Sequence, residues 1–156
     1  MLLTMQATPC FDIIRTPQSA SIDTTTIEYL ERFGLAESET RQELMAELAD
    51  IYRDCLAPGW DGYGAKSVEH SAVCEADLFI SLIPSFAPLP YISATPSGGI
   101  ALEWRKDRDN ILMLTLTGKQ QLAYAAVLNG RRRMHGTELF IDEIPEIVAK
   151  LISNFK

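Results

Sequence analysis

Cysteine and histidine are scarce in this chain, and it contains no long apolar run. Three cysteines and two histidines occur among its 156 residues. An odd and sparse set of cysteines without CxxC spacing is typical of a reducing compartment. No segment approaches the roughly 20 apolar residues of a membrane span, and the N-terminus lacks the basic region that opens a signal peptide. We therefore expect a cytoplasmic protein with no membrane partner.

Basic residues are also in the minority. The chain has 14 Lys and Arg against 21 Asp and Glu, which gives a net charge of -7. Proteins that coat DNA or RNA usually show the opposite sign, because neutralising phosphates supplies most of their affinity. The acidic balance therefore argues against nucleic acid as the partner. It suits a protein that meets a basic partner, although many enzymes are equally acidic.

The common catalytic and cofactor motifs are missing. No GxSxG nucleophile elbow occurs. The glycines of residues 59–64 do not form the GxxxxGK[ST] phosphate loop, and Asp61 between them would repel a phosphate. We therefore predict no cofactor and assign no catalytic residue. A loop acid and a strand acid can still converge, so Asp61, Glu103 and His135 stay open as the site of a small hydrolase.

One pair of residues has the spacing of metal ligands. His70 and Cys74 lie four apart in a segment with helical periodicity, so their side chains point to the same side. Zinc sites need three or four protein ligands, and the other candidates are scattered along the chain: Cys10, Cys55 and His135. We therefore predict no metal site and interpret Cys74 as a small core residue.

Helical periodicity precedes strand periodicity along the chain. Thr40 and Glu43 form a capping box, and Ser67 and Asp142 are suited to be N-caps of later helices. Asn129-Gly130 is the favoured dipeptide of a type I′ hairpin turn. The predicted helices cover residues 23–33, 40–57, 67–83 and 142–155, and the predicted strands cover 100–105, 111–117, 122–128 and 131–138. Residues 91–94 form either a further strand or an extended lead-in to the sheet.

This order of elements predicts an α+β fold. N-terminal helices precede an antiparallel β-meander of four to five strands, and a C-terminal helix packs on one face of the sheet. We expect a single globular domain overall. Its parts are an extended arm (1–22), a helical hairpin (23–57) and the α+β body (58–156).

The segment Trp60-Asp61-Gly62-Tyr63-Gly64-Ala65 is the most unusual passage in the sequence. Glycines and two large aromatic residues so close together predict a tight loop whose rings enter the core. The alternative is a binding surface, because Trp60 and Tyr63 on a rigid loop would serve as interface anchors.

A basic run, Arg131-Arg132-Arg133, lies just past the predicted hairpin tip. Strand alternation places Arg131 and Arg133 on one face of the sheet and Arg132 on the other. With the basic residues of 105–108 at a neighbouring turn, these arginines predict a local positive patch. Three interpretations stay open: solubilising charge on an edge strand, a site for a protein partner, and a site for nucleic acid.

The chain resembles a family of small uncharacterised bacterial proteins. The similarity lies in the Trp-Asp-Gly-Tyr-Gly-Ala loop, in Gly98-Gly99-Ile100-Ala101-Leu102-Glu103-Trp104, and in the later Tyr124 and His135-Gly136-Thr137. It covers about residues 55 to 155. The resemblance implies a bacterial or phage origin and a single-body fold, and it carries no catalytic residue.

These observations predict a non-enzymatic protein-binding module that inhibits or neutralises a partner. Antitoxins, immunity proteins and phage anti-defence proteins are of this type, and the alternative is the small hydrolase. We expect the binding surfaces to be the helical hairpin (23–57) and the strand with the arginine run. An amphipathic hairpin of this kind would either pair two copies into a homodimer or dock on the body of the same chain.

Overall fold

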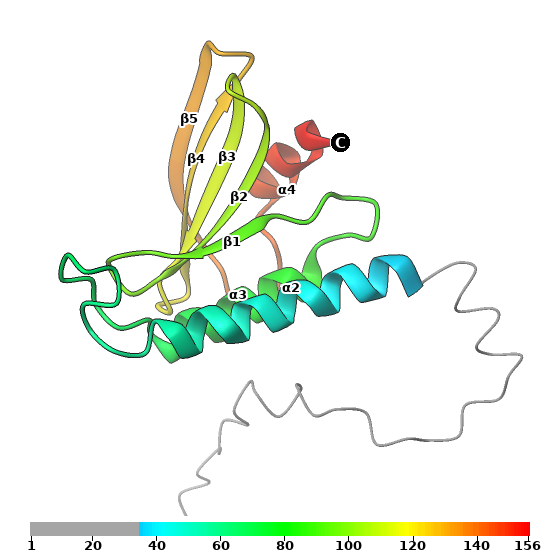
Figure 1. Ribbon diagram of the computed structural model, residues 1–156. Coiled ribbons are helices and arrows are strands. Elements are labelled where there is room, and N and C mark those ends of the chain that lie inside the picture. The colour runs from blue at the N-terminus through cyan, green and yellow to red at the C-terminus, as the bar shows by residue number, and fades with distance from the viewer. Residues whose placement is uncertain (1–34) are drawn as a thin grey trace, which may run out of the picture. The chain divides into compact units, whose positions relative to one another are not determined.

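A single antiparallel sheet organises the structure, a computed structural model that describes residues 35–156. Its five strands lie in chain order, so each strand pairs with the next (Figure 1). Residues Glu39–Lys156 form one compact unit. The predicted α+β fold is confirmed. The elements are α2 (Leu35–Asp54), α3 (His70–Leu82), β1 (Tyr91–Ala94), β2 (Ile100–Asp107), β3 (Asn110–Leu116), β4 (Gln121–Leu128), β5 (Arg132–Leu139), α4 (Glu146–Ile152) and the 3-10 helix η2 (Ser153–Phe155).

The inner face of the sheet carries the core. Phe79 of α3 lies at its centre, with ring centroids 6.3 Å from Trp104 and 5.4 Å from Phe140. The Trp104 indole N–H donates to the Pro88 carbonyl at 2.8 Å, so the buried ring keeps a polar partner. Alternate residues of the central strands are fully buried, as the period-two pattern predicts: Ile100, Leu102, Leu112, Leu114, Leu116 and Leu122.

The outer face of the sheet exposes apolar side chains. Strand register places Tyr91, Glu103, Met113, Ala125 and His135 in one row across all five strands. Tyr91 and Met113 in this row are 74% and 40% exposed. An exposed apolar surface of this kind on a sheet is a candidate interaction surface.

Two predicted helix starts are wrong. α2 begins at Leu35, so Thr40 and Glu43 lie inside the helix instead of capping it. Helix-forming residues without glycine or proline fill the stretch before Thr40, so nothing delays the helix until the capping box. α4 begins at Glu146, with Pro145 instead of Asp142 in the N-cap position.

The start of α3 is also later than predicted. The helix begins at His70, and Glu69, not Ser67, occupies the N-cap position. The backbone just before it is tied to the β1–β2 turn instead, because the Glu69 N–H donates to the Gly98 carbonyl at 2.8 Å. Apolar residues at helical spacing form a buried stripe along this helix and its C-cap: Ala72, Ala76, Phe79, Ile80 and Ile83.

The predicted strands are confirmed to within two residues, and Asn129-Gly130 lies in the turn between the last two. β5 begins at Arg132 instead of Arg131, because Leu128 pairs with Arg132 and Arg131 stays in the turn. Asn129 and Gly130 both adopt positive φ, 53° and 65°, as the two central residues of a type I′ turn do. The predicted arm (1–22) and the predicted helix at 23–33 lie outside the described residues. No helix within residues 35–156 is long and apolar enough to cross a membrane.

Candidate functional site

The glycine-rich loop, residues 59–65, is closed by its own hydrogen bonds. The Gly59 N–H donates to the Ala65 carbonyl at 2.7 Å. One carboxylate oxygen of Asp61 accepts from the N–H groups of Tyr63 and Ala65, at 2.8 and 3.0 Å. These bonds, first from Ala65 and then from Tyr63, hold the pKa of the Asp61 carboxyl below its usual range. Asp61 therefore shapes the loop.

The two aromatic residues of this loop lie in different environments. Trp60 is half-buried, and its indole N–H donates to the Lys66 carbonyl at 2.9 Å. Tyr63 is 95% exposed, so the prediction that both rings enter the core is wrong for it. The cause is the Asp61 carboxylate, which fixes a turn whose tip points the phenol into solvent. Tyr63 is thus presented to solvent on a rigid backbone.

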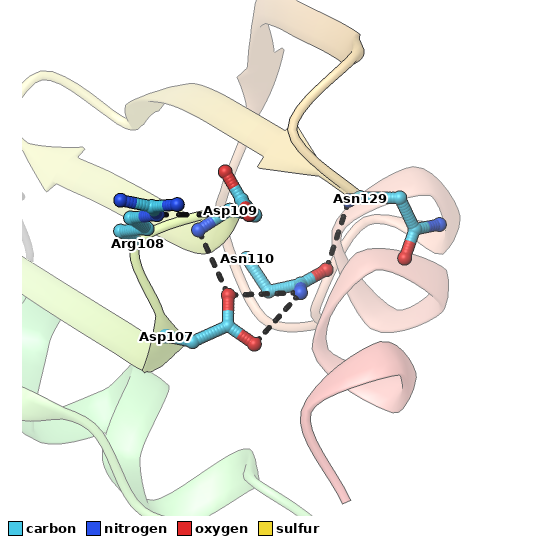
Figure 2. Close-up of polar contacts among 5 residues, drawn as sticks. All are labelled: Asp107, Arg108, Asp109, Asn110 and Asn129. Atoms are coloured by element: carbon cyan, nitrogen blue, oxygen red, sulfur yellow. Dashed lines mark hydrogen bonds and ion pairs between the residues drawn. The ribbon is translucent and has the colours of Figure 1, made fainter.

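A second ordered region lies at the opposite end of the sheet, where two hairpin turns meet (Figure 2). In the β2–β3 turn, Asp107 accepts from the Asp109 N–H at 2.8 Å and from the Asn110 side-chain amide at 3.0 Å. Asn110 then crosses to the β4–β5 turn, where its side-chain oxygen accepts from the Asn129 N–H at 3.0 Å. A further bond joins the Gly130 N–H to the Asp109 carbonyl at 2.9 Å. The two turns therefore form one unit.

The backbone at position 130 favours glycine, because Gly130 has a φ of 65°. A Cβ atom built on it would lie 2.9 Å from a carboxylate oxygen of Asp109. A side chain at this position would therefore require the exposed Asp109 carboxylate to move.

The joined turns gather basic side chains, and we call this region the basic hairpin end. Two carboxylates, Asp107 and Asp109, accompany the cations there. The Asp109 N–H and then the Asn110 amide lower the pKa of the Asp107 carboxyl, so this acid is held as a structural acceptor. The basic hairpin end comprises six cations: Arg105, Lys106, Arg108, Arg131, Arg132 and Arg133.

Some of these cations are paired, and others are not. Arg105 donates to the Glu103 carboxylate at 2.6 Å, and Arg108 lies 3.9 Å from the Asp109 carboxylate. Among the described residues, the three arginines of the run 131–133 make no ion pair, and all three are exposed. Arg133 shares the outer face with Arg105, because register places them in one row, whereas Arg132 lies opposite Leu128 on the inner face.

A cavity of about 330 Å³ adjoins the basic hairpin end. It opens beside the last residues of β2, beyond the point where β1 begins to pair with Glu103. Aromatic and cationic side chains line it together: Tyr91, Trp104, Arg105, Lys106, Phe155 and Lys156. A hollow with apolar walls and a basic rim accommodates an apolar group that carries negative charge beside it.

The predicted binding residues therefore fall into two separate places. The Lys66 N–H donates to the Pro96 carbonyl, which ties the glycine-rich loop to the β1–β2 turn. Successive turns of a meander lie at alternate ends of the sheet, so this loop lies away from the arginine run. The length of β2 separates the two ends by roughly 24 Å. Trp60 and Tyr63 accordingly belong to one surface, and the three arginines belong to another.

The open hydrolase alternative finds no convergent site in the structure. Glu103 and His135 share the outer row, but they lie on β2 and β5, three strand spacings or about 14 Å apart. Asp61 is engaged with the backbone of its own loop. A second cavity, about 300 Å³, is lined by the end of α3, the following loop and α4, and contains none of these three residues.

The pair with metal-ligand spacing does meet. The Cys74 sulfur lies 3.5 Å from His70 Nε2, and the ring of Tyr52 lies 5.7 Å from that of His70. Within residues 35–156, no group of three or more His, Cys, Asp or Glu side chains is arranged to hold a metal ion. His70 and Cys74 thus meet across one turn of α3, and Tyr52 of α2 lies beside them.

Sequence reasoning located the basic turns but missed how they are joined. Asn110 and Asn129 carry the joining hydrogen bond, and 19 residues separate them. The only local signal was the turn propensity of each asparagine. The comparisons add no relative: no protein-family model, curated protein or solved structure matches the chain.

Proposed function

We propose that this chain is a non-enzymatic protein-binding module that inhibits or neutralises a partner, as antitoxins, immunity proteins and phage anti-defence proteins do. The observation that carries the proposal is the basic hairpin end. Six cations collect on two joined turns and the strand ends beside them, in a protein whose net charge is -7. A local patch of sign opposite to the whole chain selects a partner by charge.

The rigidity of this region supports binding to a folded partner. Hydrogen bonds between the two turns hold their backbones in place before any encounter. A pre-organised surface loses little conformational freedom on association, so more of the interaction energy remains as affinity. The exposed arginine run stands on this fixed support, and arginine is enriched among residues that dominate interfaces.

The adjoining cavity indicates the chemistry of the partner surface. Its Tyr91 and Trp104 walls suit an apolar side chain, and Arg105 and Lys106 suit a carboxylate next to it. The favoured partner is therefore an acidic protein surface that carries an apolar anchor residue. The overall negative charge of the chain repels an acidic partner, but at physiological salt this repulsion is screened beyond about 8 Å. The basic hairpin end therefore attracts such a partner at short range.

The test compares two double variants of the full-length chain as bait and as purified ligand. The first reverses two cations of the basic hairpin end, Lys106→Glu with Arg131→Glu. The matched control reverses two cations elsewhere, Arg53→Glu with Lys150→Glu, so both variants have the same net charge. A partner captured by the wild-type chain from nuclease-treated bacterial lysate is purified, and its dissociation constant is measured against each.

We expect the hairpin variant to raise the dissociation constant about tenfold or more, and the control variant to leave it nearly unchanged. Raising the salt concentration should weaken the wild-type complex more than the complex of the hairpin variant. Equal losses in both variants would contradict the proposal, because net charge alone would then explain binding. A captured species that nuclease removes would place nucleic acid, not protein, at this surface.

A further inference from the structure

The last strand of the sheet has a free backbone edge. β5 lies at the end of the strand order, and among the described residues it pairs only with β4. It is eight residues long, contains no proline, and keeps a continuous register with β4. The strand at the other edge, β1, has four residues. Long, regular edges without a bulge or proline are the ones that accept another strand.

The hydrogen-bond pattern shows which residues face outward along this edge. The Phe140 N–H donates to the Gln120 carbonyl, which marks this opposed pair as hydrogen-bonded across β4 and β5. Such pairs alternate with pairs whose N–H and C=O groups point away. Counting back along the register leaves four residues of β5 with outward-facing backbone groups: Arg133, His135, Thr137 and Leu139.

The charges of β5 are self-complementary in one register. In a two-fold antiparallel pair of identical strands, residues at equal distances from the centre lie opposite each other. Outward-facing residues must pair with outward-facing residues, so the centre has to fall on a residue. Glu138 is the only acid of the strand. Of the allowed registers, the one centred on His135 places Glu138 opposite Arg132 of the partner subunit, and symmetry makes this pair twice.

We propose that this chain forms a two-fold symmetric dimer through the edges of β5, which joins the two five-stranded sheets into one continuous antiparallel sheet. Pairing about His135 makes about six backbone hydrogen bonds. Arg132 and Glu138 share the inner face, because both are even-numbered positions of one strand. In this register each arginine of β5 lies opposite a carboxylate or an uncharged residue of the partner subunit. The arginines therefore favour this register and oppose registers that would place two arginines together.

The dimer uses two cations of the basic hairpin end, Arg132 and Arg133, but not the two that test the partner site. Lys106 lies on β2 and Arg131 lies in the β4–β5 turn, so both stay outside the paired strands and remain accessible. Either proposal can therefore fail alone. The dimer also differs from the homodimer expected through the N-terminal helices, because its contacts lie entirely within the strand.

The test measures the mass of the full-length chain by light scattering and sedimentation equilibrium over a range of concentrations. We expect the wild-type chain to reach twice its monomer mass of 17.4 kDa. Arg132→Glu alone and Glu138→Arg alone should each raise the dimer dissociation constant about tenfold or more, because each creates two like-charge pairs. Arg53→Glu and Glu43→Arg change the net charge equally on α2 and should leave the dimer intact.

Mixing the two single variants supplies the decisive result. Arg132→Glu and Glu138→Arg chains complement each other at both pairs, so an equimolar mixture should form a heterodimer although neither variant dimerises well alone. The variant that combines both changes should also regain the dimer. A wild-type chain that stays monomeric at its highest soluble concentration overturns the proposal. So does a dimer that all these variants form equally well, because its interface would then lie elsewhere.

Cross-linking gives a second measurement that does not depend on charge. The register places His135 opposite itself, with Cα atoms about 5.5 Å apart in a hydrogen-bonded pair, which is within the range of a disulfide. His135→Cys should therefore form a covalent dimer under mild oxidation. Ser93→Cys, exposed on β1, should not. Equal cross-linking of both variants would contradict the register.

Discussion

Replacing Glu75 with alanine should lower the free energy of unfolding by about 2–3 kcal/mol. Glu75 lies on α3, and its two carboxylate oxygens accept from two N–H groups of the β3–β4 turn. The bonds are 2.8 Å from the Gly118 N–H and 2.6 Å from the Gln120 N–H. Gln120 adopts a φ of 58°, which is uncommon for a residue with a side chain. The carboxylate thus holds both an irregular turn and the helix above it.

The magnitude follows from the number and environment of these bonds. A hydrogen bond to a charged group contributes about 1.5–3 kcal/mol when it is shielded from water. Glu75 and Gly118 are only half-buried, so water replaces part of each bond after the substitution. Values at or somewhat below the lower end of the range, about 1–1.5 kcal/mol, therefore apply to each bond, and their sum gives the expected loss.

Equilibrium unfolding in urea, followed by tryptophan fluorescence, measures this loss, because Trp104 is buried in the native core. Glu75→Gln keeps one carbonyl oxygen but turns an amide donor toward the second N–H group, so its loss should fall between those of wild type and alanine. Glu69→Ala removes the same charge from the same helix at a residue whose side chain makes no capping bond. A loss for Glu75→Ala no larger than that of Glu69→Ala would refute the reasoning.

Two carboxylates should give opposite pH effects. Backbone hydrogen bonds hold the pKa of Asp61 below the ordinary value of about 3.9, so its contribution is fully present above that value and is lost as the pH falls through the folded-state pKa. Asp61→Asn keeps an oxygen acceptor that does not titrate. Between pH 6 and pH 2, its unfolding temperature should therefore fall less than that of the wild type. Equal falls in both proteins would contradict this cause. Burial raises the pKa of Asp77, so its ionised form destabilises the folded state above the folded-state pKa, and acid relieves that cost. Asp77→Asn should therefore raise the unfolding temperature at pH 7 and lose this advantage below about pH 3.9, whereas a lower unfolding temperature at pH 7 would show that the carboxylate has a favourable contact.

The candidate surfaces illustrate how far local patterns reach. The arginine run and the basic residues of 105–108 were expected to form a patch, since turns of neighbouring hairpins lie at one end of a meander. The cavity beside that patch was not expected. Its walls come from β1, β2 and the C-terminal 3-10 helix, and no short segment of sequence contains more than part of it.

The enzyme alternative also depended on tertiary placement. Asp61, Glu103 and His135 were chemically plausible partners, and nothing in their spacing forbade a shared site. Strand order separates Glu103 from His135 by two intervening strands, although both point to the same face. Asp61 holds the geometry of the glycine-rich loop, in agreement with the tight loop that the sequence predicted there.

The sequence by itself determined the strands, the α3 stripe and the turn at Asn129-Gly130. These features depend on backbone conformation and on side-chain alternation within a few residues, and both are encoded locally. The tertiary structure alone decided where α3 begins and that Glu75 binds the β3–β4 turn. Each of these depends on a hydrogen bond or a contact whose geometry is set only when the chain is folded, and 43 residues separate Glu75 from Gly118. A local pattern carries no signal for such contacts, because the chain between the two partners must fold before their distance is defined.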